Sequence, residues 1–399
     1  MRLQRNSRRW FGALAAQLGA VLAASVLVGL GEPPTSSPQS PPTAVPTASE
    51  AIEVNLRSPL LSGFWGRDIM MNATIVVPDD VDVATLPVCY DVHGFGGNHK
   101  RGHRIAAELK RRMRDEGYPK MAYVFLDGSC ALGHHEFADS VNNGPRGQAL
   151  VEEFIPAIEA RLGGVREPSQ RFLTGHSSGG WSVLWLQVNY ADSFGGCWAT
   201  SPDPVDFRDF SGVDLYRATN IFHDDGGQPR PLVWHGKDVA MTFEQFVRQE
   251  LKRGDVGGQM ASFDAVFSPR GDDGRPMPMY DRASGAIHPD IVDAWKRYDI
   301  GLILRERWPA LAPKLKGKLH VWCGDEDTFG LQGAVRLLKA DLAALGSDAD
   351  VLLVPGRDHG SIMAPHQEHW PKGMIERVHT EMLAQSKNRP AGEPASRSK

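Results

Sequence analysis

The sequence predicts an α/β fold, in which a mostly parallel central sheet is covered by helices on both faces. Three observations predict it. Strand-like and helix-like segments alternate between about residues 51 and 385. Most strand-like segments are apolar throughout, which is typical of strands buried on both faces of a parallel sheet. A glycine- and serine-rich stretch at 175–180 leads directly from one such strand into an apolar helical pattern.

The composition is that of an ordinary globular protein. The chain has 399 residues, of which 41% are hydrophobic and 23% are charged, so one large domain or two smaller ones would fit. The net charge of −4 gives no reason to expect a nucleic-acid partner. The four cysteines include no Cys-x-x-Cys pair, and we expect them to be buried free thiols.

Both ends of the chain are expected to lie outside the fold. Residues 1–30 begin with several arginines and continue with about twenty mostly apolar residues, which predicts an export signal. The stretch Ser7-Arg8-Arg9-Trp10-Phe11 resembles the twin-arginine signature, and a membrane anchor at residues 10–30 is the alternative. Residues 31–50, rich in Pro, Ser and Thr, predict a linker, and residues 386–399 predict a disordered tail.

The first half of the fold is predicted to start with strands at Asn72–Pro78, Pro87–Phe95 and Met121–Gly128. Apolar residues at four-residue spacing indicate a helix before the third of these strands. These residues are Ile105, Leu109 and Met113. A second helix follows, which Pro156 should kink. Its apolar face consists of Leu150, Val151, Phe154, Ile158 and Leu162.

The second half ends with two strands on either side of a helix that stops at Gly346. Between strands 6 and 7 the alternation breaks from about Asp203 to Lys318. A structureless connection of that length is uncommon, so we expect an insertion packed over the sheet and the active site. Its aromatic residues either wall a pocket or only hold the insertion together. They include Trp234, Phe243, Phe246, Phe263, Tyr280, Trp295 and Tyr298.

The pattern Gly175-x-Ser177-x-Gly179 fits a nucleophile elbow, a sharp strand-to-helix turn that exposes a serine hydroxyl above the sheet. Such a turn is crowded, so its flanking positions need residues without a Cβ atom. A glycine-rich loop without chemistry is the alternative interpretation. The strand before and the helix after favour the elbow.

A serine nucleophile needs a base, and the base needs an orienting acid. Both are expected after the serine in the chain, at the carboxyl ends of later strands. His359 follows the last strand and is the predicted base. Asp327 is preferred as the acid over Asp325, which we expect to cap the next helix. The adjacent His134-His135 lack a suitably spaced third ligand, so no metal site is predicted.

The reaction also needs main-chain N–H groups where negative charge develops on the substrate oxygen. Ser178, the residue after the nucleophile, is one predicted donor. The others are Phe95 and Gly96 in the loop His93-Gly94-Phe95-Gly96-Gly97, which is like the glycine-rich loop of many esterases. A simple glycine-rich turn is the alternative.

Several stretches together resemble the putative-esterase family of α/β-hydrolases, which includes S-formylglutathione hydrolases, enterochelin esterases, feruloyl and related carbohydrate esterases, and mycolyltransferases. They are HGFGG, FADSVNNGP, GHSSGGW, YDIGLILRERW, GKLHVWCGDEDTF and PGRDH. The resemblance implies the α/β-hydrolase fold, with Ser177 as nucleophile, Asp327 as acid and His359 as base. The long insertion departs from the compact members, so the substrate cannot be carried over from them.

Asn142 and Asn143 follow the strand at 121–128 and should border the pocket. They could hydrogen-bond a substrate, or they could form an Asx turn and cap the helix at 147. The sequence leaves both roles open.

Together these features predict an exported serine esterase, periplasmic or secreted, that acts on a small-molecule or carbohydrate ester through an acyl-enzyme. No cofactor or metal is required. An acyltransferase would use the same triad and is the alternative function. A non-catalytic binding protein would be expected to lack a triad residue or an oxyanion glycine, and all of these residues are present.

Overall fold

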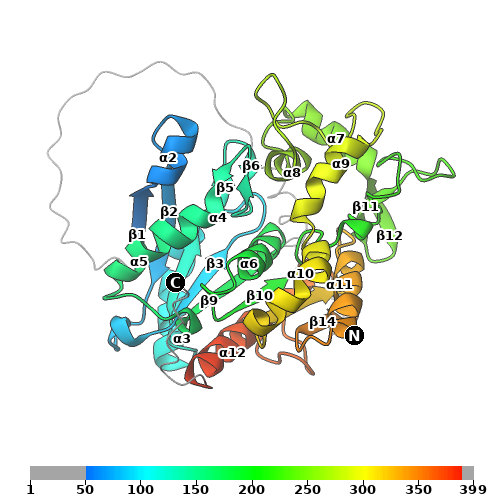
Figure 1. Ribbon diagram of the computed structural model, residues 1–399. Helices are drawn as coiled ribbons and strands as arrows, with labels where there is room; N and C mark the ends of the chain where they lie inside the picture. The colour runs from blue at the N-terminus through cyan, green and yellow to red at the C-terminus, as the bar shows by residue number, and fades with distance from the viewer. Residues whose placement is uncertain (1–50, 389–399) are drawn as a thin grey trace, which may run out of the picture. The chain divides into compact units, whose positions relative to one another are not determined.

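The central sheet dominates the computed structural model, which describes residues 51–388 (Figure 1). The predicted export signal and linker lie outside the described residues. The strand order of the sheet is β1-β2-β4-β3-β9-β10-β13-β14. The strands from β4 to β14 are parallel, whereas β1–β2 and β2–β4 pair antiparallel. The predicted mostly parallel sheet is therefore confirmed.

The sheet strands other than β1 agree with the predicted strand segments, whereas the mostly exposed edge strand β1 was not predicted. The strands of the sheet are β1 (Ile52–Arg57), β2 (Met70–Val76), β3 (Val88–Val92), β4 (Ala122–Leu126), β9 (Arg171–His176), β10 (Gly196–Thr200), β13 (Leu319–Gly324) and β14 (Asp350–Val354). Every residue of β3, β4 and β10 is buried. Burial on both faces explains why these strands show no polar alternation.

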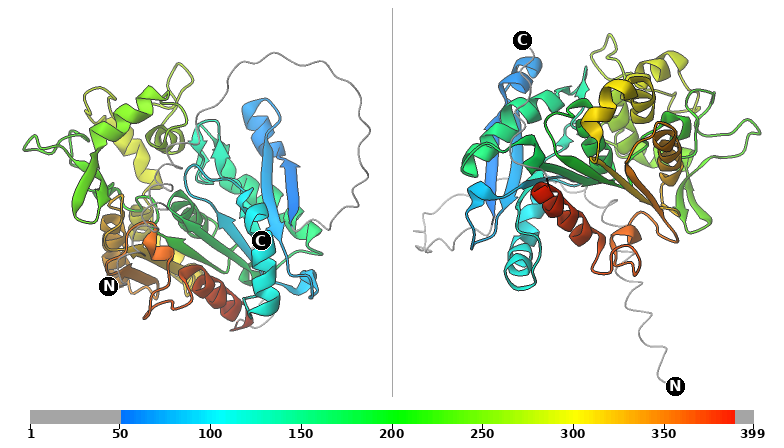
Figure 2. Two further views of the ribbon diagram at one scale, coloured as in Figure 1. Left: turned by 180° about the vertical axis from the view of Figure 1, so that it is seen from behind. Right: turned by 60° about the horizontal axis from the view of Figure 1, so that its bottom comes forward.

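Helices cover both faces of the sheet. One face carries α3 (Arg101–Asp115) and α12 (Met374–Asn388), whose buried side chains pack in one core with residues of the strands. Figure 2 shows these two helices, cyan and red, on the same side of the sheet. The other face carries α6 (Ser178–Asn189), α10 (Ile300–Leu315) and α11 (Gln332–Ala344), which share a larger core with α5 (Ile155–Arg161).

Two of the predicted helices differ from expectation in detail. In α3 the residue Ile105 is 42% exposed, and the buried face is formed by Gly102, Ala106, Leu109 and Met113. The helix containing Pro156 is not simply kinked. Between α4 (Arg146–Ala149) and α5 it widens into a π-helical segment at Leu150–Phe154, just before the proline that lacks an N–H.

The insertion has its own secondary structure and is shorter than predicted. It contains β11 (Pro231–His235), β12 (Asp238–Thr242), α7 (Phe243–Lys252), α8 (Gln259–Phe267) and α9 (Pro289–Trp295). Helix α10 packs on α6 and α11 and so belongs to the layer over the sheet. The predicted boundary at Lys318 was therefore too late, because Pro309 and Pro313 inside α10 obscure its helical pattern.

Aromatic residues join the insertion to α6. Phe267 contacts Trp181 at a ring-centroid distance of 5.1 Å, and Tyr298 contacts Trp185 at 5.3 Å. Five of the aromatics singled out in the sequence are buried in this core. They are Phe243, Phe263, Tyr280, Trp295 and Tyr298. These five side chains hold the insertion together.

Shorter elements surround the carboxyl edge of the sheet. They are α2 (Pro59–Trp65), β5 (Ser129–Cys130), β6 (Gly133–His134), β7 (Asp139–Ser140) and β8 (Gly144–Pro145). Cys89, Cys197 and Cys323 are buried free thiols, whereas Cys130 is a free thiol that is only half-buried, contrary to the expectation of burial. Helix α12 continues beyond the predicted start of the tail, because Ser386 is buried and its carbonyl accepts from Gln170. Within residues 51–388, no helix combines the length and the apolar character that a membrane span needs.

Candidate active site

Ser177 lies in a strained turn between β9 and α6. Its backbone angles are φ 60° and ψ −127°, a conformation that residues with a side chain rarely adopt. A Cβ atom at Gly175 would lie 2.2 Å from the Gly179 carbonyl oxygen, and one at Gly179 would lie 2.0 Å from that of Val92. No side chain fits at either position, so the two glycines of the Gly-x-Ser-x-Gly pattern are sterically required.

His359 and Asp327 form a hydrogen-bonded pair at the same edge of the sheet. The Nδ1 atom of His359 lies 2.8 Å from Oδ2 of Asp327. Asp327 is fully buried, and its other oxygen accepts from the main-chain N–H of Phe329 at 2.9 Å. The ring of His359 contacts two other rings. One belongs to Phe329, and the other to His176, the residue before Ser177.

The pKa shifts of this pair suit a histidine base that is oriented by an ionised aspartate. Burial would lower the pKa of His359, but the charge of Asp327 and the hydrogen bond to it outweigh burial, so the pKa is raised. Burial would also raise the pKa of Asp327, yet the same interactions with His359 keep that pKa below its usual value. Asp327 therefore stays ionised and orients the imidazole.

Asp325 does not have the helix-capping role that we expected. Its Oδ1 atom accepts from the main-chain N–H of Gly356 at 2.7 Å, in the loop between β14 and His359. The carboxylate thus braces the loop that carries the histidine. The prediction that Asp325 caps the following helix was wrong.

The loop after β3 lies against Ser177. A Cβ atom at Gly94 would be only 3.2 Å from Cβ of Ser177. Among residues 51–388 the main-chain N–H groups of Phe95 and Gly96 have no hydrogen-bond partner. The N–H of Ser178 is the first of helix α6, where intrahelical acceptors are absent. The Ser178 N–H directly follows the serine, and the loop that carries Phe95 and Gly96 approaches it at Gly94.

His93 fixes the shape of this loop. Its Nε2 accepts from the Gly128 N–H at 2.9 Å, so its Nδ1 carries the hydrogen that is donated to the Gly94 carbonyl at 2.8 Å. The same carbonyl accepts from the Gly97 N–H at 3.1 Å. Burial lowers the pKa of His93, which agrees with the neutral ring that these contacts require.

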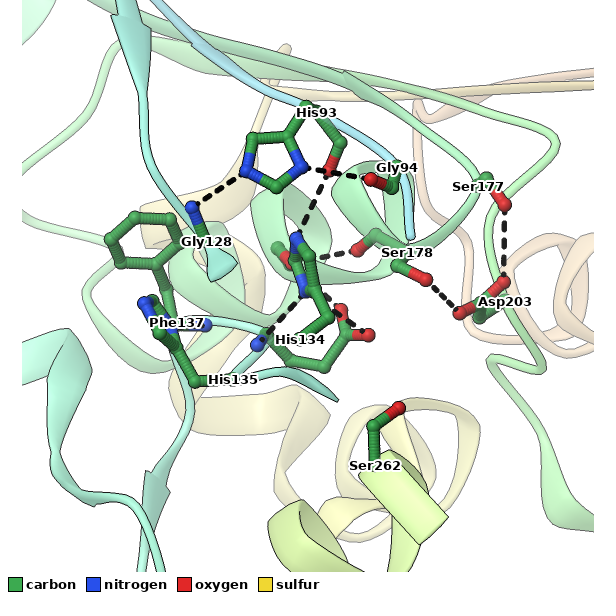
Figure 3. A network of polar contacts seen from close by, with 12 residues as sticks. His93, Gly94, Gly128, His134, His135, Phe137, Ser177, Ser178, Asp203 and Ser262 are labelled. Atoms are coloured by element: carbon green, nitrogen blue, oxygen red, sulfur yellow. Dashed lines mark hydrogen bonds and ion pairs between the residues drawn. The ribbon is translucent and has the colours of Figure 1, made fainter. Parts of the chain in front are cut away.

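Asp203 is a residue of the site that the sequence reasoning missed. Its Oδ1 accepts from the Ser177 hydroxyl at 3.4 Å and its Oδ2 from the Ser178 hydroxyl at 2.5 Å (Figure 3). The side chain is buried, and burial together with the nearby Glu136 raises the pKa of Asp203 to about 7. Its position directly after β10, at the carboxyl edge, was the available signal, but it had been assigned to the insertion.

Behind Ser178, a buried polar chain leads back to the loop of His93. The Ser182 hydroxyl lies 2.6 Å from the Ser178 carbonyl oxygen and 2.7 Å from Oε2 of Glu136. Burial raises the pKa of Glu136 to about 8. His134 donates from Nε2 to the His93 carbonyl at 3.1 Å, and burial lowers its pKa to about 4. The Glu136 N–H donates to Nδ1 of His134 at 3.1 Å, so this chain connects Asp203 with the glycine-rich loop. Figure 3 labels the two ends of the chain, Asp203 with Ser178 and His134 with His93.

Asn142 and Asn143 are buried and bind the insertion. The side-chain amide of Asn142 donates to the Ser268 carbonyl at 2.8 Å, and that of Asn143 donates to the Ala265 carbonyl at 3.2 Å. The helix start at 147 is capped by Asp139, not by either asparagine. Of the two roles left open, the helix cap is therefore not seen, and the side-chain amides of both asparagines are used in contacts with the insertion.

The insertion reaches the site on two sides. The N–H of Trp234 in β11 donates to the Thr328 carbonyl at 2.7 Å, directly after Asp327. On the other side α8 packs against β6 and β7, beside the buried polar chain. Trp234 itself is only half-buried.

Comparisons with known families and solved structures show what the chain is similar to. The family model described as "Putative esterase" matches residues 67–299, more than half of the chain. No curated protein sequence matches the chain. Among solved structures, a ferulic acid esterase is similar at 13% identity with a TM-score of 0.51, over 84% of this chain and 97% of that one.

Two further structures are similar at lower TM-scores. The fluorophosphonate-binding serine hydrolase F of Staphylococcus aureus is 14% identical, with a TM-score of 0.48 over 84% of this chain and 98% of that one. Carboxyl esterase 2 of Tuber melanosporum is 15% identical, with a TM-score of 0.48 over 93% and 97%. The protein belongs to the putative-esterase family and has the α/β-hydrolase fold.

Proposed function

We propose that the protein cleaves carboxylic esters with Ser177 as nucleophile, His359 as base and Asp327 as orienting acid. The Ser177 hydroxyl turns from Asp203 towards Nε2 of His359, which takes its proton as Oγ attacks the carbonyl carbon. His359 then returns that proton to the alcohol as the ester C–O bond breaks, leaving an acyl-enzyme. Water, deprotonated by His359 in the same way, releases the acid and restores Ser177.

The negative oxygen formed in both steps is stabilised by the N–H groups of Ser178, Phe95 and Gly96. The proposal rests on one observation above the others. A serine held at φ 60° stands at the sheet edge where the hydrogen-bonded His359–Asp327 pair also lies. The contact of His176 with His359 joins these two parts of the site.

The test is labelling by a fluorophosphonate probe, followed by mass spectrometry of the modified peptide. Wild-type protein should be labelled at Ser177, and Ser177→Ala should lose both labelling and ester hydrolysis while staying folded. Ser178→Ala keeps its main-chain N–H and is the matched control that should still be labelled. Labelling at any other serine would contradict the proposal. Added alcohol that captures the acyl group would point to acyl transfer instead.

We further propose that the protein is exported and acts on a small-molecule or carbohydrate ester outside the cytoplasm. The arginines and apolar residues of 1–30 support export. Replacing Arg8 and Arg9 by lysines should retain the protein in the cytoplasm, as cell fractionation would show. Unchanged export of that variant would exclude the twin-arginine route.

A further inference from the structure

A polar pocket of about 220 Å³ opens beside α2, β5 and the start of α4. Figure 1 shows these elements around the same part of the fold. Strand β5 follows the carboxyl end of β4, which lies two strands away from β9 in the sheet. The pocket therefore lies beside the carboxyl edge of the sheet that also carries Ser177. None of the residues assigned to the proposed mechanism lines it.

Arg146 is the unusual residue of this pocket. Its side chain is only 7% exposed, and its Nε donates to the Asn143 carbonyl at 3.1 Å. Within residues 51–388 it forms no ion pair, although a buried charge is costly unless it is paired. Arg146 is also the first residue of α4, where the helix dipole disfavours a positive charge. The positive charge of the Arg146 guanidinium therefore lies at the pocket without a carboxylate of the described residues paired to it.

The other charges near the pocket do not supply that compensation. Arg67 adds a second guanidinium to the lining and lies 5.7 Å from the centre of the Trp65 ring. Asp68 also lines the pocket, but its carboxylate pairs with Arg57. Burial lowers the pKa of Arg146, and the weaker attraction of nearby acidic groups does not offset it.

Asp127 is close enough to act on Arg146, yet its carboxylate is already occupied. It hydrogen-bonds to Nδ1 of His99 at 2.8 Å and to the Ser129 hydroxyl at 2.6 Å. The pocket therefore presents an excess of positive charge with one wall formed by Trp65.

We propose that this pocket binds an oxyanion group, a carboxylate or a phosphate, through Arg146 with Arg67 at the rim. The planar fork of an arginine matches both groups, and such charge-assisted hydrogen bonds are strong. The volume would hold several waters, so it accommodates either group with a short organic stem. The anion is either part of the ester substrate or a separate small molecule.

The first experiment titrates the full protein with inorganic phosphate by calorimetry, with chloride added to keep the ionic strength constant. Wild-type protein should bind phosphate saturably. Arg146→Gln should weaken binding about tenfold or more, and the exposed Arg67→Gln, which should fold normally, several-fold. Arg217→Gln removes an exposed charge outside the pocket and is the matched control. No saturable binding, or equal binding by Arg67→Gln and wild type, would overturn the proposal.

The second experiment finds the source of the anion by comparing an ester that carries a distal carboxylate with its neutral methyl-ester analogue. If the anion belongs to the substrate, Arg67→Gln should lower kcat/KM several-fold for the charged ester only, and phosphate should compete with that ester. If phosphate binds but neither ester is affected, the ligand is a separate anion. The phosphate titration needs no enzymatic activity, so failure of the proposed esterase mechanism would not be mistaken for failure of this site.

Discussion

The two aspartates after β13 have different roles. One orients the ring of His359, and the other supports the loop that carries it. Asp327 touches the ring directly, whereas Asp325 holds the main chain at Gly356. We expect Asp327→Asn to lower kcat about 10⁴-fold, because the imidazole loses its orientation and the charge that stabilises its protonated form. Asp325→Asn should cost far less. Steady-state kinetics on both variants, with folding checked by circular dichroism, tests this, and the reverse order would show that the acid is misassigned.

Asp203 raises the pKa of His359 when it is ionised, and with its own pKa of about 7 it carries part of that charge on the acid limb of the activity profile. Burial lowers the pKa of His359, Asp327 raises it most, and the charge of Asp203 raises it further. Asp203→Asn keeps the shape and removes that charge, so the pKa of His359 should fall. The base then becomes neutral at lower pH, and the acid limb of the kcat/KM profile should move to lower pH. Asp325→Asn is the charge-matched control, and an acid limb that stays in place would argue against this coupling.

The sequence identified the residues whose spacing or motif marks them, and missed those that act through tertiary contact. The strained serine, the paired histidine and the preferred aspartate each follow a strand in a known pattern. Asp203 also follows a strand, but no motif marks it, and only the fold brings its carboxylate to Ser177. For Asn142 and Asn143, the carbonyl groups that they bind belong to a segment more than a hundred residues away.

At the scale of elements, we expect hairpin β11–β12 of the insertion to border the substrate, because its main chain bonds to the residue after Asp327. Trp234 bonds to the chain beside Asp327 and remains half-buried. Trp234→Ala should therefore change the ratio of kcat/KM between bulky and small esters several-fold, because it removes apolar surface near the pocket mouth. Phe246→Ala, also half-buried but on α7, is the comparison. An unchanged ratio in Trp234→Ala would mean that the insertion is a separate lobe.

Elements were predictable where one physical signal dominates. Continuous apolar runs gave the buried strands because both sheet faces are covered. The end of the insertion was not predictable, since Pro309 and Pro313 normally argue against a helix such as α10. The π-helical segment at Leu150–Phe154 was likewise hidden, because the apolar spacing does not report which carbonyl each N–H reaches.

At the scale of the whole molecule, we expect the Glu136 carboxyl of the buried polar chain to be protonated. The Ser182 hydroxyl has one hydrogen but lies within bonding distance of both the Ser178 carbonyl and Glu136. Both contacts are satisfied when Glu136 is protonated and donates to Ser182, which then donates to Ser178. This geometry agrees with the pKa of Glu136, which burial raises to about 8.

A proton held in the folded state makes stability depend on pH. Between about pH 5 and pH 8 folded Glu136 keeps its proton whereas unfolded Glu136 has lost it, so stability should fall as pH rises. Glu136→Gln offers the same donor and acceptor without titrating. It should reduce the slope of unfolding free energy against pH by about 1.4 kcal/mol per pH unit near pH 6.

Urea unfolding at several pH values measures that slope. Glu152→Gln, at an exposed position of the π-helical segment Leu150–Phe154, is the control. A slope in Glu136→Gln equal to that of the wild type would show that Glu136 is ionised in the folded protein.

The place of the insertion in the chain also determines when the molecule becomes active during folding. Strand β10 ends at Thr200, and its neighbour β13 begins only at Leu319. Closing so long a loop costs chain entropy before any contact repays it, and such distant pairings form slowly. The strands that carry Asp327 and His359 should therefore dock late on a half-sheet that already holds Ser177. In a refolding experiment, ester hydrolysis should accordingly recover after the helical circular-dichroism signal, and simultaneous recovery would mean that the two halves of the sheet form together.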